Sequence, residues 1–369
     1  MGYIPKKTLE DLEFFKVTKQ LSSFAVTHMG KEKCVSLVPI EESQSMHDAL
    51  LCVSEFLASF DNDNRIPNHG FEDLSSSFQL LKIENSVLEL SAFRNIAVAS
   101  ETVNNLLIFF KKFKSYYPSL YSRGSEMEVN KELKKETDNV IDRFGEIRDN
   151  ASETLYGLRK EIQSVRGKIG QSFNKALSHY HGQDFLDDIR ESVVENKRVL
   201  AVKAMYRRKV KGGIMGGSKT GSIVFIEPEA TLAHSRELQN LLFEESEEIK
   251  KILSQLTDFF RPHLELIKSY QTYLIEIDTF HARGRYAKEI NALLPSFSKT
   301  QELELIDAYH PLLYRTHQLE NKKTYPQDIY LKPDRRIVVI SGPNAGGKSI
   351  TLKTVGLLQL MLQSGILIP

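Results

Sequence analysis

Apolar residues along most of the chain recur at spacings of three and four, which predicts a mostly helical protein. Near the start, Thr8 is a candidate helix cap, and acidic residues follow it in the first turn. Further helical patterns run from about Met46 to Phe60 and from Ser91 to Phe113, with proline, glycine and serine between them. The first 115 or so residues are therefore predicted to form a helical domain.

The next part of the chain carries a single apolar stripe. Between Ser125 and about His179 the sequence is charge-rich and contains no proline. Its apolar residues follow heptad-like spacings at Leu155, Leu158, Ile162, Val165, Ile169 and Phe173. One stripe of this kind on a polar background is typical of a long exposed helix or a coiled-coil arm.

The period shortens towards two between about Phe185 and Pro228. Val193-Val194 and residues 198–202 flank Glu195-Asn196, which predicts a hairpin. The glycine pairs at 212–213 and 216–217 are predicted to form turns, and residues 222–226 another strand that ends at Pro228. This segment is therefore predicted to be a small β insert carried on helices.

Helical spacing returns after the β insert. Residues 230–260 are predicted to form one helix, and Pro262 suits the first turn of another that continues to about Leu294. One long helix leading out to the insert and one leading back predict an antiparallel arm with a β tip. Residues 297–333 are predicted to be loop and strand, with strands near 304–306 and 308–313.

Composition changes this picture little. The chain has 369 residues, the apolar and charged content of an ordinary soluble protein, and a net charge of +1. Any attraction to nucleic acid must therefore come from a local patch.

The two cysteines, Cys34 and Cys52, lack C-x-x-C spacing and are expected to be reduced, buried thiols. We find no signal peptide and no membrane-spanning run, so we expect a cytoplasmic protein without membrane association.

The clearest chemical signal is a phosphate-binding loop near residue 342. The sequence GPNAGGKS fits the pattern G-x-x-x-x-G-K-[ST]. The run Ile337–Ile340 before it is predicted to be a buried strand, and residues 350–362 after it a helix. Glycine-rich turns point backbone N–H groups at a polyphosphate, and the helix start adds positive potential. The candidate phosphate-binding residues are Gly342, Asn344, Ala345, Gly346, Gly347, Lys348 and Ser349.

The motif assigns ATP and Mg²⁺ as ligands and says nothing of catalysis. Lys348 is expected to reach the β- and γ-phosphates, and Ser349 to hold Mg²⁺. Hydrolysis also needs an acidic residue at the metal and a residue that orients water. Neither can be assigned after Pro369, the last residue, so we assign no catalytic residue. We expect weak nucleotide binding and no turnover by this chain alone.

A second chemical signal is a basic patch within the β insert. No acidic residue occurs from Val199 through Phe225. Cations at glycine-rich turns suit contact with a phosphate backbone, and the alternative is a solvated, charged hairpin face. Tyr206 suits either stacking on a base or packing. The candidate nucleic-acid-binding residues are Lys203, Arg207, Arg208, Lys209, Lys211 and Lys219.

Three polar residues, His281, Arg283 and Arg285, follow one another along the predicted helix after Pro262. We interpret them as polar helix positions and not as metal ligands.

The phosphate loop and the residues ITLKTVGL after it resemble the MutS family of DNA-handling ATPases, most closely its second bacterial branch, MutS-two. Three other segments support this resemblance. Residues 202–207, with Gly221 and 225–228, are similar to the clamp of that branch, and residues 278–287 to its returning core helix. Tyr309-His310-Pro311-Leu312 is similar to a segment near the adenine, so the resemblance implies an adenine-side role for Tyr309 and His310.

The resemblance implies a mostly α fold with a helical core, a long antiparallel helical lever arm, a small β clamp at its tip and the start of an α/β P-loop ATPase domain of the ABC type. The helical core would comprise residues 1–124 and 262–296. The lever helices would be 125–182 and 229–261, the clamp 183–228, and the ATPase portion 297–369. The chain is thus expected to be the N-terminal part of a longer protein.

For that longer protein, the resemblance implies a homodimeric ATPase that binds branched or recombination-intermediate DNA and suppresses recombination, often with a C-terminal Smr endonuclease domain. The alternative is a member directed to ribosomal RNA that rescues stalled ribosomes.

Mismatch recognition is not expected. The mismatch-repair branch uses a Phe-x-Glu wedge in an N-terminal domain, whereas the tripeptides of this form here lie in the predicted arm or clamp, at 144–146, 225–227 and 243–245. A mechanical ATPase of the SMC type ranks low because the arm precedes the phosphate loop.

Overall fold

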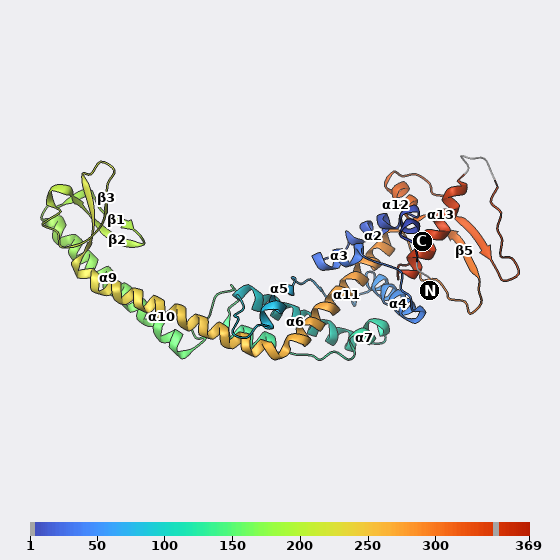
Figure 1. Cartoon of the computed structure of the whole chain (residues 1–369), viewed down its shortest axis with the longest axis horizontal. Helices are drawn as coiled ribbons and strands as arrows, with labels where there is room; N and C mark the ends of the chain where they lie inside the picture. Colours follow the sequence, from blue (N-terminus) through green and yellow to red (C-terminus); the bar gives the residue numbers. More distant parts are fainter. Residues whose placement is uncertain (1–3, 342–346) are drawn as a thin grey trace. The chain divides into compact units, whose positions relative to one another are not determined.

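The structure, a computed structural model, describes residues 4–341 and 347–369. These residues are mostly helical, and their strands form small antiparallel sheets, which confirms the predicted mostly-α class. The chain divides into two compact units (Figure 1). The first comprises Met1–Ile83, Ser91–Lys135 and Phe260–Pro369, and the second Glu84–Leu90 and Glu136–Phe259. No described helix is both long enough and apolar enough to cross a bilayer.

The first unit is built around one buried helix, α11 (Leu264–Glu289). Its apolar side chains point in several directions, and Tyr270, Leu274 and Tyr286 are almost fully buried. Such a helix must be covered on several sides, and α11 packs against α2, α3 and α4. The other helices of this part of the chain are α1 (Lys6–Asp11), α2 (Phe14–Ser22), α3 (His28–Val35), α4 (Ser43–Ser59), α5 (Ser75–Leu81), α6 (Leu90–Lys112), α7 (Pro118–Gly124) and the 3₁₀ turn η2 (Arg261–His263).

The C-terminal segment of this unit contributes a small sheet and two helices. Strands β5 (Leu303–Ala308) and β6 (Gln327–Leu331) pair antiparallel. Between them lies α12 (Pro311–Leu319), and the segment ends with α13 (Lys348–Gln363). Helix α13 packs against α2 and α4, and its Leu357, Leu358 and Met361 are buried.

The second unit is a pair of long helices joined to a sheet. Helices α9 (Glu153–Gly182) and α10 (Glu229–Phe260) run side by side (Figure 1). Leu158, Ile162 and Val165 from the predicted stripe are buried against Leu241 of α10. The short helix α8 (Glu132–Val140) precedes this pair in the chain.

The four-stranded sheet of the second unit has the order β1-β2-β4-β3, with antiparallel neighbours. Phe173 of α9 anchors the sheet, because it is buried in one cluster with Leu200, Val202 and Ile226. The predicted hairpin at Glu195-Asn196 is confirmed, since both residues have positive φ, as a two-residue hairpin turn of type I′ requires. The elements are β1 (Leu186–Val194), β2 (Lys197–Lys203), η1 (Ala204–Tyr206), β3 (Gly212–Gly217) and β4 (Ile223–Pro228).

The glycine pairs at 212–213 and 216–217 were predicted to form turns, and this prediction is wrong. Both pairs lie within strand β3. Gly212 pairs with Pro228 of β4, and a Cβ atom on Gly212 would lie 2.0 Å from the carbonyl oxygen of Glu227. Glycine here serves close approach of two strands rather than a change of direction.

The strand predicted at Ile337–Ile340 is also wrong. These residues are not in a strand, and Ile337 and Val339 are each 85% exposed. An apolar run becomes a buried strand only where neighbouring strands take its backbone hydrogen bonds. Among the described residues no strand pairs with this run, and β5 and β6 form a separate two-stranded sheet.

Four other boundaries differ from the prediction. Helix α1 begins at Lys6 after the N-cap residue Pro5, so Thr8 lies inside the helix and does not cap it. Residues 311–319 form helix α12 rather than strand, because His310 caps that helix and Pro311 suits its first turn. The long helix of the arm begins only at Glu153, after the cap Ser152 accepts a hydrogen bond from the N–H of Leu155. Helix α11 ends at Glu289 and does not reach Leu294, because Asn291, two residues after its end, adopts the left-handed conformation.

Candidate nucleic-acid and nucleotide sites

The structure gathers three of the predicted basic residues at one hollow in the surface of the second unit. Arg207, Arg208 and Lys211 line it, together with Val210, Gly212, Ile214, Ile226, Glu229 and Leu232. All three cationic side chains are exposed. In the described part of the chain, none of them forms an ion pair, although the carboxylate of Glu229 lines the same hollow.

Packing of the neighbouring residues positions these cations. Val210 is buried in the sheet's apolar cluster and fixes the loop between η1 and β3. Tyr206 stacks on Phe185, with ring centroids 4.8 Å apart, and Lys209 lies 5.4 Å above Phe185 and 5.5 Å above Tyr206. Tyr206 therefore packs within the protein, the second of its two predicted roles. Anchored on both sides, Arg207 and Arg208 project outward.

Lys203 and Lys219 lie apart from this hollow. Lys203 Nζ is 2.9 Å from Asp184 Oδ1, and the hydrogen bond to that carboxylate raises the pKa of Lys203. Lys219 lies in the turn between β3 and β4, where the hydroxyls of Thr220 and Ser222 are 2.9 Å apart. The six predicted cations thus do not form a single cluster.

Two further polar residues escaped the sequence analysis. Lys175 and His179 of α9 line a second hollow with Lys211, and Glu229 borders both hollows. Their spacing of four residues, directly after Phe173, puts both on one side of the last helical turns. This spacing is visible in the sequence, but the charge-rich segment by itself predicts only a long helix or a coiled-coil arm.

The nucleotide segment is described from Gly347 onwards. Gly347 has φ 83° and caps α13, which begins at Lys348. Lys348 and Ser349 lie in the first turn of this 16-residue helix, whose N-terminal end is positive. Lys348 is half-buried and Ser349 is exposed. The rest of the predicted loop, Gly342, Asn344, Ala345 and Gly346, lies outside the described residues.

The two residues predicted on the adenine side have structural contacts. His310 is buried and its Nδ1 accepts a hydrogen bond from the N–H of Leu313 (3.5 Å) at the start of α12. Burial lowers the pKa of His310, while the charge of Glu13 opposes this and that of Lys353 adds to it. Lys353 belongs to α13, so His310 lies near the helix that begins at Lys348. Tyr309 is half-buried and its ring lies edge-on to Tyr314, 5.0 Å between centroids.

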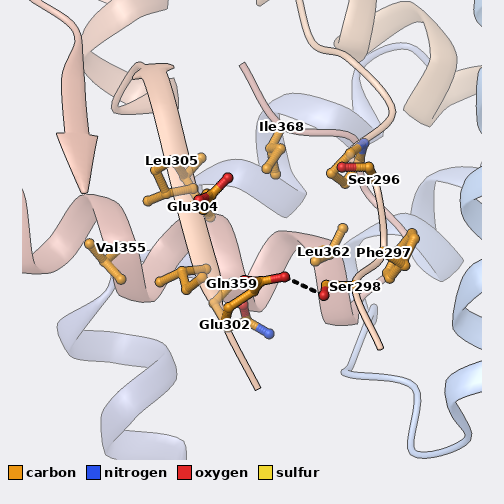
Figure 2. Close-up of a pocket in the computed structure, with 13 residues that line it drawn as sticks. Ser296, Phe297, Ser298, Glu302, Glu304, Leu305, Val355, Gln359, Leu362 and Ile368 are labelled. Carbon is orange, nitrogen blue, oxygen red and sulfur yellow. Dashed lines mark hydrogen bonds between the residues drawn. The ribbon is translucent and has the colours of Figure 1, made fainter. Parts of the chain in front are cut away.

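A separate pocket lies between β5 and α13 (Figure 2). Glu304 and Leu305 of β5 face it from one side, and Val355, Gln359 and Leu362 of α13 from the other. Ser298 donates a hydrogen bond to Glu302 at its edge. None of the predicted nucleotide residues that the structure describes lines this pocket, so it is distinct from the predicted phosphate site.

The core of the first unit contains a polar cluster that the sequence did not predict. Asp278 accepts hydrogen bonds from the N–H groups of Val26 and Thr27 (both 2.9 Å) and from the Thr27 hydroxyl (2.6 Å). His69 Nε2 lies 3.1 Å from Asp278 Oδ1. Burial alone would raise the pKa of Asp278, but the hydrogen bonds from His69, Thr27 and Val26 lower it to about 2. His281, one turn along α11, completes the cluster.

Comparison with known proteins finds relatives of this chain that share one name. No family model matches the chain. It is 32% identical over 368 residues to the endonuclease MutS2 of Lactobacillus helveticus, covering 98% of this chain and 46% of that protein. It is 30% identical over 367 residues to the endonuclease MutS2 of Bacillus velezensis and, equally, to the putative endonuclease MutS2 of Bacillus subtilis, in each case covering 99% of this chain and 46% of the relative.

The resemblance to the second bacterial branch of the MutS family is thereby confirmed, because the similarity to MutS2 proteins extends over nearly the whole chain. The chain spans somewhat less than half the length of these relatives.

Proposed function

We propose that this chain is the DNA-binding part of a MutS2-type ATPase and contacts the backbone of branched DNA through the hollow lined by Arg207, Arg208 and Lys211. The exposure of these three cations at one hollow, with no carboxylate paired to any of them in the described residues, is the observation that carries the proposal. Guanidinium and ammonium groups are the usual partners of phosphate oxygens.

The proposed contact follows the phosphate backbone and does not read sequence. The aromatic residues beside the cations are packed within the protein. Tyr206 stacks on Phe185, and the hydroxyl of Tyr180 accepts a hydrogen bond from the backbone N–H of Lys211 (3.3 Å). We propose that this cationic surface favours places where phosphates converge, as they do at a junction. Because counterions are released for each phosphate contacted, affinity should fall steeply with salt.

We also propose that Mg-ATP binds at the start of α13 and influences the clamp. The support is the sequence motif together with the geometry of Gly347, Lys348 and Ser349 at a helix N-terminus. Tyr309 and His310 remain the proposed adenine-side residues, and the proximity of His310 to Lys353 of α13 is compatible with that role.

The remaining parts of the proposal concern the complete protein. Its relatives carry the name endonuclease, and we assign no cleavage step to any residue of this chain. In the complete protein, we propose, two copies form a homodimeric ATPase that suppresses recombination by holding branched intermediates.

Binding of this chain to three labelled probes tests the proposal: a four-way junction, a linear duplex of the same length and a structured RNA. Fluorescence anisotropy at low and at physiological salt should show that the junction binds most tightly and that salt weakens the complex. Preference for the RNA would contradict the proposal and favour a ribosomal target. Binding to none of the probes at low salt would contradict the assignment of the hollow.

A further inference from the structure

Three metal-ligating side chains from distant parts of the sequence meet in the core of the first unit. Asp278 and His281 are one turn apart on α11, so they share a face of that helix. His69 comes from the segment before α5, 209 residues ahead of Asp278. One potential ligand atom from each residue lies within 4.8 Å of the other two.

One ring nitrogen in this cluster has no partner. Nδ1 of His281 is buried and forms no hydrogen bond to any described residue. The backbone of Phe24 acts as an acceptor toward the His281 ring, so we place the proton of the neutral ring on the other nitrogen, Nε2. In the neutral ring, Nδ1 then carries a lone pair. A buried lone pair without a donor is unfavourable unless another group occupies the space in front of it.

The donor set and its surroundings suit a first-row transition metal. Two imidazoles and one carboxylate are ligands of zinc and of related divalent ions. With metal–ligand bonds of about 2.1 Å, tetrahedral ligand atoms lie ~3.4 Å apart. The 3.1 Å between His69 and Asp278 is already close to that value. The outer contact of Asp278 matches as well, since its carboxylate accepts a hydrogen bond from the hydroxyl of Thr27.

Space for a further ligand lies beside the cluster. A cavity of about 430 Å³ is lined by His69 and His281, and also by Arg285 and Lys288. Lys288 is paired with Asp61, and Arg285 lies 5.3 Å above Phe60. Because Asp61 already balances the charge of Lys288, Arg285 is the cation that favours an anionic fourth ligand such as hydroxide or chloride over a neutral one.

We propose that His69, Asp278 and His281 bind one divalent transition-metal ion, of which zinc is the most suitable probe. The ion replaces the proton between His69 and Asp278 and takes the lone pair of His281 Nδ1. It would tie α11 to the segments around Thr27 and His69 and so stabilise the helical core. The sequence alone predicts a polar helix position for His281, and its proximity to His69 depends on the fold.

Metal binding to the whole chain provides the test. The protein is stripped with EDTA, equilibrated with Zn²⁺ and analysed for bound metal, and Co²⁺ is then used as a spectroscopic probe. We expect one tightly bound ion per chain, a rise in melting temperature with zinc, and a cobalt spectrum of imidazole and carboxylate ligands without a thiolate charge-transfer band. The absence of a bound ion, or a thiolate band from Cys34 or Cys52, would overturn the proposal.

Two variants locate the ion. His281→Gln removes a ring nitrogen that forms no hydrogen bond to any described residue, and should weaken zinc binding more than about tenfold without unfolding the metal-free protein. His28→Gln, on the exposed surface of the same unit, is the matched control and should bind as the wild type does. Undiminished zinc binding by His281→Gln would overturn the proposal. Should that variant fail to fold, the cobalt spectrum of the wild type still decides between imidazole and thiolate ligation.

Discussion

The carboxylate of Asp278 accepts hydrogen bonds from the backbone N–H (2.9 Å) and the hydroxyl (2.6 Å) of Thr27, which lies 251 residues earlier in the chain. This contact joins α11 to the start of α3 inside the first unit. It also explains why a charged residue lies fully buried on a core helix: every oxygen of the carboxylate has a donor.

Replacement of that carboxylate should be costly. In Asp278→Asn, one oxygen becomes an NH₂ group that faces the N–H groups of Val26 or Thr27, so buried donors lose their acceptor. We expect a loss of about 3 kcal/mol in the free energy of unfolding, measured by urea denaturation in EDTA. Asp63→Asn, on the exposed surface of the same unit, should change it by less than about 0.5 kcal/mol. Equal effects of the two variants would contradict this account of Asp278.

Two glycine substitutions should have opposite effects. A Cβ atom on Gly30 would lie 2.1 Å from Oδ2 of Asp278, whereas one on Gly167 of α9 would meet nothing within 4 Å. We expect Gly30→Ala to destabilise the protein by about 1–3 kcal/mol, and Gly167→Ala to stabilise α9 by up to about 1 kcal/mol. Thermal unfolding of both variants checks the prediction, and stabilisation by Gly30→Ala would contradict it.

The two cysteine thiols should be inert in the native protein. Cys34 and Cys52 are free and buried, and burial raises the pKa of each to about 12. Between the ordinary thiol pKa of about 8.5 and 12, the native state holds protons that the unfolded state has lost, so stability should fall as pH rises through this range.

Alkylation with iodoacetamide at about pH 8.5 checks the thiol prediction. Neither thiol should react in the native state and both should react in urea, because the thiolate is the reactive form. The variant Ser36→Cys, at an exposed position two residues after Cys34, provides a thiol that should react at once. Rapid native alkylation of Cys34 or Cys52 would show that burial does not control their reactivity.

Mg-ATP should stabilise the first unit through Lys348. A ligand that binds only the native state raises the melting temperature, so millimolar Mg-ATP should produce a measurable rise by differential scanning fluorimetry. Lys348→Ala should remove that rise, while Lys299→Ala, at an exposed position of the same unit, should retain it. A rise that persists in Lys348→Ala would place the nucleotide elsewhere.

Local patterns in the sequence predicted several elements well. The stripe from Leu155 to Phe173 predicted α9 because helical packing needs only one apolar face, which can be seen in the sequence. The hairpin at Glu195-Asn196 was likewise evident, since the turn chemistry lies in two adjacent residues.

Features that depend on distant residues were not predictable in this way. Ile337–Ile340 has the composition of a strand, but strand formation needs a neighbour that the sequence pattern does not show. Gly212 of β3 is explained only by the carbonyl of Glu227 opposite it. For the same reason the basic patch could be predicted as a list of cations, whereas the grouping of Arg207, Arg208 and Lys211 required the fold.

The salt dependence of junction binding tests the central claim, that the hollow binds phosphate, most directly. Binding of a four-way junction is measured over a series of salt concentrations for the wild type, for Arg207→Glu/Arg208→Glu, and for the control Lys111→Glu/Lys112→Glu, which has the same charge change at an exposed end of α6. Loss of two phosphate contacts should weaken binding and lower the slope of log K against log salt by about 1.8. The control should resemble the wild type. An unchanged affinity and slope in the arginine variant would contradict the proposed function.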